Sequence, residues 1–199
     1  MNTSAQQRKW ESNSFVRLTT LVFVLSFASF SVAQITSVGR AGRFVLWKNE
    51  IEVVWNFARD HCKGDGGWLA ADVSVESHNV LVTVPGAGGA AWLGGSDEAE
   101  DDVWRWVTGP VGREDKGRGR VFFKGTYTNN PTCILQHCFW NINEPNDWNS
   151  AIGEQFLMVL GGTVRWNDLA SHGHNVSIGT RPASRSRLRR ALAGEAGPN

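Results

Sequence analysis

The spacing of apolar positions changes along the first half of the chain and predicts a strand followed by two helices. Residues 43–47 are rich in β-branched and aromatic side chains, which favour an opening strand. From Glu50 to Cys62 apolar residues recur at helical spacing, and glycines at 64, 66 and 67 end the predicted helix. A second short helix is expected from Ser74 to Val84, before a Pro-Gly-Ala-Gly-Gly turn.

The second half of the chain predicts short strands separated by long loops. The stretches 109–119 and 126–152 are polar, and the second is rich in Asn, Pro and Trp. A loop of this length in a compact domain usually carries function. The apolar segments before, between and after these loops are expected to be strands: 91–94, 103–107, 121–123, 155–160 and 163–166. Two helices followed by short strands predict an α+β fold.

Both ends of the chain differ from this central part. Residues 1–33 combine a basic leader, an apolar run and Ser31-Val32-Ala33, which is the pattern of a signal peptide. The apolar run is short for a membrane span of about 20 residues, although an uncleaved signal anchor is the alternative. Residues 173–199 are rich in arginine and lack aromatic residues, so a disordered basic tail is expected there. One domain over 43–171, secreted or anchored with the domain facing outside, is the resulting prediction.

Composition narrows the function classes. A hydrophobic share of 41% is enough for a packed core, and a net charge of +1 gives no electrostatic reason to expect a nucleic-acid partner. Ten tryptophans beside one tyrosine indicate a Trp-rich core, a stacking surface, or both. Cys133 and Cys138 are close enough in sequence to form a local disulfide bond. Cys62 is then left as a free thiol, an intermolecular partner or a sign of an incomplete chain.

Oxygen-bearing side chains gather between positions 144 and 168. Carboxylates and carboxamides are the hard oxygen ligands that suit Ca²⁺, which takes six to eight oxygens at about 2.4 Å. Because no Cys or His is mixed in, zinc is a poor fit. Pro145 lies between two of these residues and can hold a cis bond that turns both side chains toward one point. The candidate ligands are Glu144, Asn146, Glu154, Asn167 and Asp168.

The order of several short motifs resembles the C-type lectin domain family over about 130 of the 199 residues. The matching pieces are Trp55-Phe57-Ala58-Cys62, Gly67-Trp68-Leu69-Ala70, Ser74 with Glu76, Ala91-Trp92-Leu93-Gly94-Gly95, Trp104-Arg105-Trp106, Glu144-Pro145-Asn146 and Trp166-Asn167-Asp168. The resemblance implies a C-type lectin-like fold, with short helices packed on small antiparallel sheets and a long ligand-binding loop. It also implies that the five candidate residues bind both calcium and sugar.

The Glu-Pro-Asn form implies a preference for mannose, fucose or N-acetylglucosamine, and glycans or glycoproteins as partners. Trp148 complicates this expectation, since galactose-binding members tend to carry a tryptophan there. Its indole could stack on a pyranose ring, or pack on its own loop. The alternative function is a domain of the same fold that binds protein or another surface without calcium. An enzyme is not expected, because no nucleophile stands at recognisable spacing from a base.

The sequence departs from the family in two ways. The family commonly has four framework cysteines, and only Cys62 matches one of them. The family also usually ends in an aromatic-aliphatic strand that pairs with the first strand. Residues 169–181 offer only Val176 and Ile178 for this purpose, so this last strand is expected to be missing. If no other segment replaces it, the edge at 43–48 is left unpaired.

Overall fold

A computed structural model of the protein describes residues 35–41, 44–83, 89–148, 153–161, 165–173 and 175–183. These residues belong to one compact unit, residues 32–199. The predicted signal peptide at 1–33 lies outside the described residues, as do positions 184–199 of the predicted tail.

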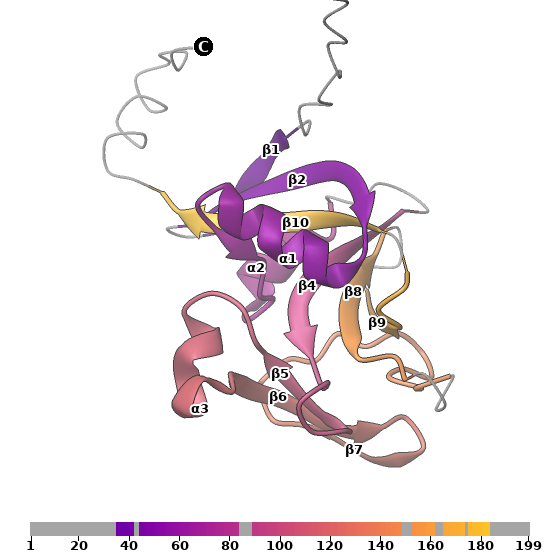
Figure 1. Ribbon diagram of the computed structural model, residues 1–199. Coiled ribbons are helices and arrows are strands. Elements are labelled where there is room, and N and C mark those ends of the chain that lie inside the picture. Colours follow the sequence, from indigo (N-terminus) through magenta and orange to yellow (C-terminus); the bar gives the residue numbers. More distant parts are fainter. Residues whose placement is uncertain are drawn as a thin grey trace, which may run out of the picture. The chain divides into compact units, whose positions relative to one another are not determined.

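The described elements alternate short strands with a few short helices, so the predicted α+β class is confirmed (Figure 1). They follow the order β1 (Ile35–Ala41), β2 (Phe44–Val53), α1 (Trp55–Gly64), β3 (Trp68–Leu69), α2 (Val75–Leu81), β4 (Ala90–Ser96), β5 (Val103–Trp106), the 3-10 helix η1 (Val111–Arg113), α3 (Glu114–Gly117), β6 (Arg120–Thr126), β7 (Asn129–Cys133), β8 (Phe156–Leu160), β9 (Arg165–Leu169) and β10 (Asn175–Pro182).

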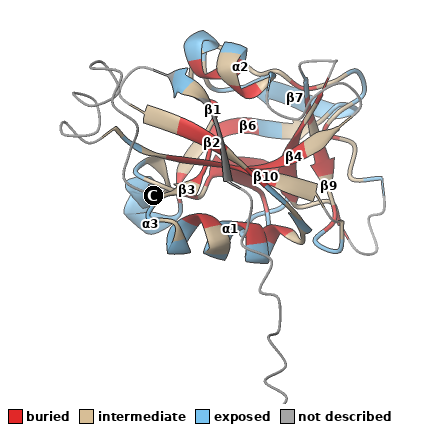
Figure 2. Ribbon diagram, turned by 90° about the horizontal axis from the view of Figure 1, so that it is seen from above, coloured by how far each residue is buried: buried red, intermediate tan, exposed pale blue. Residues whose placement is uncertain are grey.

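The strands form one mixed sheet in the order β1-β2-β10-β4-β5-β6-β7. β8 pairs with β4 and β9, and β3 pairs with β10. The β10–β4 pairing is parallel, and the other strand pairings are antiparallel. Figure 2 shows α1 and α2 on opposite sides of the β2–β10 part of the sheet. The last strand therefore lies between the first strands and β4.

The expected loss of the last strand is wrong. β10 pairs with β2 along its length, from Asn175 opposite Val53 to Pro182 opposite Phe44, and β1 covers the other edge of β2. Residues 175–182 thus belong to the domain and not to a disordered tail. Because β1 lies before residue 43, the predicted domain limits of 43–171 are too narrow at both ends.

Trp47 explains why β10 carries so few large apolar residues. A Cβ atom at Gly179 would lie 2.2 Å from the Trp47 ring, so only glycine fits beneath the indole. The large side chain comes from β2, and β10 contributes small residues and the fully buried Ile178. The sequence of β10 resembles a polar tail because the large apolar side chain at this strand pair belongs to β2.

The first predicted helix begins later than its spacing indicated. Ile51 and Val53 belong to β2, and the helix starts at Trp55. Strand pairing on both sides of β2 outweighs local helical spacing. The start of the second helix is confirmed. The Ser74 hydroxyl accepts the Ser77 N–H, and the Ser77 hydroxyl accepts the Ser74 N–H.

Tryptophans fill the core, as the composition predicted. Trp104, Trp106 and Trp166 are almost fully buried and pack around Phe122 and Trp140. A second cluster forms where Trp55 stacks on Phe156 at 4.7 Å between ring centroids.

The cysteines follow the predicted pairing. Cys133 and Cys138 form the local disulfide bond. Cys62 is a free, fully buried thiol, and burial raises its pKa to about 12, so it is a core residue without nucleophilic character. Within the described ranges, no helix has the length and apolar character needed to cross a membrane.

Candidate functional site

The five candidate ligands come from two segments that β8 and β9 bring together. Glu144 and Asn146 lie in the loop between β7 and β8, and Glu154 lies just before β8. Asn167 and Asp168 lie in β9, where Asp168 is opposite Leu157 of β8. The peptide between Glu144 and Pro145 is cis, as predicted.

Asp168 holds the loop that follows Pro145. Its Oδ2 atom accepts the backbone N–H groups of Asn146 at 3.0 Å and Asp147 at 2.9 Å. Tyr127, in the turn between β6 and β7, donates its N–H to the Pro145 carbonyl at 2.9 Å. The loop is therefore fixed from two directions, by a buried carboxylate of β9 and by the neighbouring hairpin.

Glu154 holds the next part of the same loop. Its Oε2 atom accepts the Trp148 N–H at 3.0 Å, and its own N–H donates to Asp147 Oδ1 at 2.8 Å. Burial raises the pKa of Glu154, and the charges of Asp168 and Asp147 raise it further. Glu154 thus lies within electrostatic range of the Asp168 carboxylate.

Glu144 and Asp168 approach each other without a donor between them. Their carboxyl groups lie at hydrogen-bonding distance, yet Glu144 Oε2 and Asp168 Oδ1 are buried and accept no hydrogen bond. Asn146 Oδ1 is buried and unpartnered in the same way. Burial raises the pKa of both carboxyl groups, and for Glu144 the neighbouring Asp168 raises it further. Such a pair requires either a proton or a cation.

Asn167 has a different orientation from the other four candidates. Its Nδ2 group donates to the backbone carbonyl of Asp168. Within the described part of the chain, no group of three or more His, Cys, Asp or Glu side chains is arranged to hold a metal ion. Asp168 contacts the backbone of Asn146 and interacts with Glu144, Glu154 lies within its electrostatic range, and Asn167 is turned along its strand.

Asp97 is a further acidic residue that the sequence reasoning missed. It directly follows β4 and is only 7% exposed. Burial raises its pKa to about 7, and the charges of Asp101 and Asp168 act in the same direction. Its position two residues after the run 91–95 was the available signal, since a polar residue that closely follows a buried strand often lies at the edge of a site.

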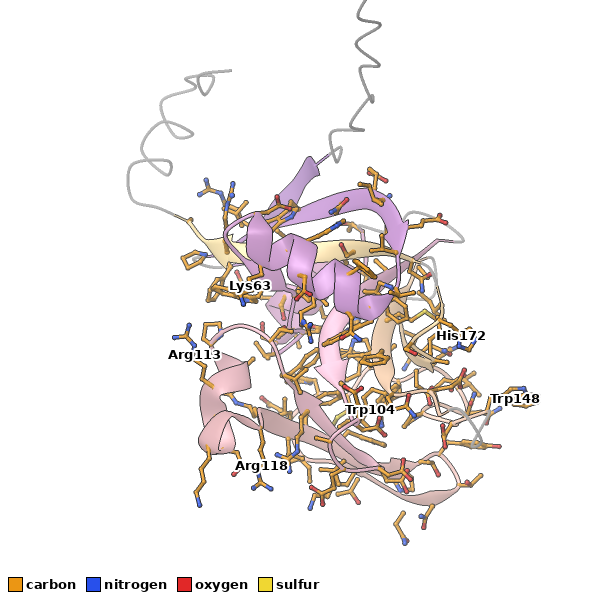
Figure 3. The ribbon with its side chains drawn as sticks, viewed as in Figure 1. Lys63, Trp104, Arg113, Arg118, Trp148 and His172 are labelled. Carbon is orange, nitrogen blue, oxygen red and sulfur yellow. A yellow bond between two sulfur atoms is a disulfide. The ribbon has the colours of Figure 1, made fainter. Side chains whose placement is uncertain are left out.

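Two large apolar side chains of this loop face solvent. Trp148 is 86% exposed and Ile142 is 82% exposed, the largest values among the large hydrophobic residues that the structure describes. Figure 3 shows Trp148 pointing away from the ribbon. Trp148 therefore does not pack on its own loop, and its indole is accessible to a ligand.

Comparisons with known proteins find both similar sequences and similar structures. No family model matches the chain. Two curated relatives match: C-type lectin domain family 4 member F of Mus musculus, 28% identical over 116 residues, and C-type lectin domain family 17, member A of Homo sapiens, 27% identical over 118 residues. The matches cover 58% and 59% of this chain but only 17% and 24% of the relatives, so the chain spans a quarter or less of their length.

Solved structures resemble this chain over about 70% of its length. The human scavenger receptor C-type lectin carbohydrate-recognition domain superposes with a TM-score of 0.56 at 14% identity, covering 72% of this chain and 95% of that domain. The chain has a C-type lectin-like fold. Within this C-type lectin-like fold, the carbohydrate-recognition domain of cow CD23, whose structure was determined with a GlcNAc2Man3 oligosaccharide, has a TM-score of 0.52 at 22% identity, covering 71% of this chain and 90% of that domain.

The same C-type lectin-like fold occurs in a protein that works without calcium. A calcium-independent type II antifreeze protein has a TM-score of 0.52 at 21% identity and covers 73% of this chain and 92% of its own. The curated relatives support the C-type lectin domain family, whereas the fold by itself leaves calcium dependence open.

Proposed function

We propose that this C-type lectin-like domain binds carbohydrates with the help of calcium and acts as an exported lectin. The proposed ligands of the ion and the sugar are Glu144, Asn146, Glu154, Asn167 and Asp168. The proposed sugars are of the mannose, fucose or N-acetylglucosamine type, carried by glycans or glycoproteins. No enzymatic activity is proposed.

The observation that carries this proposal is the group of buried oxygens without donors. Glu144 Oε2, Asn146 Oδ1 and Asp168 Oδ1 come from both segments of the site, and all three are acceptors that nothing in the described protein satisfies. Leaving such groups buried and unpaired costs about 1–3 kcal/mol each, more when they are charged. A hard divalent cation satisfies oxygen ligands and also removes the repulsion between the carboxylates, so the residues fit Ca²⁺.

A bound Ca²⁺ would offer open coordination positions to two neighbouring hydroxyls of a sugar. The protein supplies the hydrogen bonds around those hydroxyls, because carboxylates accept and carboxamides donate. Asn167 takes part once its amide turns from the Asp168 carbonyl toward the sugar. The exposed indole of Trp148 supplies an apolar face beside the same loop.

Retention on mannose-agarose tests the proposal. The purified protein is expected to bind in millimolar Ca²⁺ and to elute with a chelator, with Mg²⁺ as the control cation because Mg²⁺ demands a smaller, octahedral site. Equal retention in calcium and in chelator contradicts calcium dependence. Absence of retention on mannose, fucose and N-acetylglucosamine matrices contradicts the sugar class.

A second candidate is binding of a protein or another surface without calcium. The exposed Ile142 and Trp148 favour it, because large apolar side chains in solvent mark interaction surfaces. The resemblance to a calcium-independent antifreeze protein also fits this candidate. The two candidates separate in the same experiment, since only the first predicts loss of binding in chelator.

A further inference from the structure

The two most exposed large hydrophobic residues of the described chain flank the proposed sugar site along the sequence. Ile142 stands two residues before Glu144, and Trp148 stands two residues after Asn146. Since consecutive Cα atoms lie about 3.8 Å apart, the Cα atom of each exposed residue is within about 8 Å of that of a proposed ligand residue. A sugar bound at the site therefore has apolar side chains on either side of it along the loop.

Hydrogen bonds hold the backbone beneath both side chains. Ile142 lies in a turn that the Glu144 N–H closes by donating to the Asn141 carbonyl at 3.2 Å. The Trp148 N–H donates to the Glu154 carboxylate at 3.0 Å. Figure 3 shows the Trp148 side chain pointing away from the ribbon. The two apolar side chains are thus presented to solvent by a backbone that is fixed at the site itself.

Tyr127 adds a third apolar side chain beside the same loop. It lies in the turn between β6 and β7, is 45% exposed, and donates its N–H to the Pro145 carbonyl at 2.9 Å. Tryptophan and tyrosine are enriched where lipid meets water, because their rings combine an apolar body with a polar group. We call Tyr127, Ile142 and Trp148 the apolar rim of the sugar site.

The size of the apolar rim favours a lipid surface over a protein partner. Its three side chains expose on the order of 400 Å², whereas a stable protein interface covers about 800 Å² on each partner. A lipid surface needs no complementary shape, but weak apolar insertion requires a second contact for stable binding. The sugar site next to the rim supplies such a contact.

We propose that the sugar bound at this site is the head group of a glycolipid, and that the apolar rim enters the membrane interface around it. This inference rests on the function proposed above, because the sugar site supplies the specific contact. Trp148 and Tyr127 lie at the level of the head groups, and Ile142 contacts the first acyl carbons. The preferred partner is therefore a membrane that displays mannose-type head groups, and the same sugar without its lipid binds more weakly.

Vesicle binding with two matched glycolipids tests this inference. The probes are phosphatidylcholine vesicles that carry mannosyl diacylglycerol, with the mannose attached either directly or through a long ethylene glycol spacer. Both vesicles display the same number of sugars, but the spacer lifts the sugar, and with it the apolar rim, away from the bilayer. In calcium, the protein is expected to bind the direct head group at least about fivefold more tightly, because even partial burial of one large apolar side chain gives such a factor.

Two matched variants locate the effect. Ile142→Ser should remove the preference for the direct head group. Phe57→Ser should keep it, since Phe57 is an exposed apolar residue of α1, outside the sugar loop. Both variants should be retained on mannose-agarose in calcium to the same extent as the unchanged protein, which shows that they fold and bind the sugar.

The outcomes distinguish this inference from the proposed function. Loss of all retention on mannose-agarose overturns both. Normal retention there, with equal affinity for the direct and the spaced head group, overturns the membrane inference alone. An equal loss of preference in both serine variants, or vesicle binding that persists in chelator, also overturns it. If Ile142→Ser weakens binding to a mannosylated protein as much as to vesicles, the apolar rim contacts protein and the assignment to lipid is wrong.

Discussion

The carboxylate of Asp72 accepts a hydrogen bond from the indole nitrogen of Trp166 at 3.0 Å, across 94 positions of sequence. The same carboxylate accepts the Ser77 hydroxyl at 3.0 Å and the Nδ1 atom of His78 at 2.6 Å. Because a carboxylate only accepts, Nδ1 carries the hydrogen. Trp166 directly precedes Asn167 and Asp168, so this buried carboxylate anchors the strand that carries two proposed ligands.

Replacing Asp72 with alanine is expected to lower the free energy of unfolding by about 2–4 kcal/mol, since three buried donors lose their acceptor. Urea denaturation of the calcium-free protein measures the loss, and exposed Asp101→Ala is the matched control. A loss no larger than that of the control would show that the Asp72 contacts do not stabilise the fold.

Much of this fold could be predicted, because its elements carry their own apolar patterns. The strands around Trp92 and Trp104 and the helix capped by Ser74 lie close to where the residues indicated. β10 and β7 could not be found in this way. Gly179 is small because Trp47 occupies the space above it, and all five residues of β7 are exposed. β10 packs under a side chain of β2 and β7 buries no residue, so neither strand shows an apolar strand pattern in its own sequence.

The candidate site, too, could be predicted from the sequence only in part. Residue type and order were enough to select Glu144, Asn146 and Asp168 as residues that meet. Sequence could not indicate that Asp97, directly after β4, adds a buried carboxyl near Asp168, because that proximity depends on how β4, β8 and β9 pair. The side-chain orientations of Asn167 and Trp148 likewise depend on backbone geometry that residue identity does not encode.

Calcium is expected to stabilise the protein against heat. Ligand binding to the native state adds RT ln(1 + [L]/Kd), or about 2.7 kcal/mol at a hundredfold excess over Kd, which is several degrees of Tm for a domain of this size. Glu144→Gln should reduce this gain. The same substitution should raise the Tm in chelator, because it removes the repulsion between Glu144 and Asp168.

These two opposite signs make the calcium prediction specific. Scanning calorimetry with Ca²⁺ and with chelator measures both, and Glu52→Gln at an exposed position of β2 serves as the control. If Glu144→Gln gains as much from calcium as the unchanged protein does, Glu144 is not a ligand.

The raised pKa of Asp97 predicts that the stability of the protein depends on pH. Its folded pKa, about 7, lies above the ordinary value of 3.8, so the folded state binds the proton more tightly than the unfolded state does. The stabilising contribution is fully present below pH 3.8 and is lost as the pH rises through about 7. Its slope is at most about 1.4 kcal/mol per pH unit.

Asp97→Asn should flatten this slope, because the amide cannot take up the proton but still accepts the Asp102 N–H that now binds Asp97 Oδ2. Urea denaturation in chelator between pH 4 and 8 measures the difference between the variant and the unchanged protein. Parallel curves for the two proteins would mean that Asp97 is ionised in the fold throughout this range.

The double substitution Glu144→Gln with Asn146→Asp is expected to shift sugar preference from mannose toward galactose. Exchanging the carboxylate and the carboxamide reverses which side of the ion accepts and which donates hydrogen bonds, while the number of oxygen ligands stays the same. The exposed Trp148 already supplies a face for stacking on the apolar side of a pyranose. The gain should therefore depend on this residue, and Trp148→Ala in the double variant should remove it.

Competition elution from mannose-agarose and galactose-agarose in calcium measures the shift as a ratio of sugar concentrations. The double variant leaves the net charge of the loop unchanged, and Asn143→Asp, an exposed change in the same loop, shows whether charge there by itself moves the ratio. A ratio that stays unchanged in the double variant, while calcium still raises its Tm, would mean that Glu144 and Asn146 bind the ion without contacting the hydroxyls. A ratio that moves equally in the control would reduce the effect to loop charge.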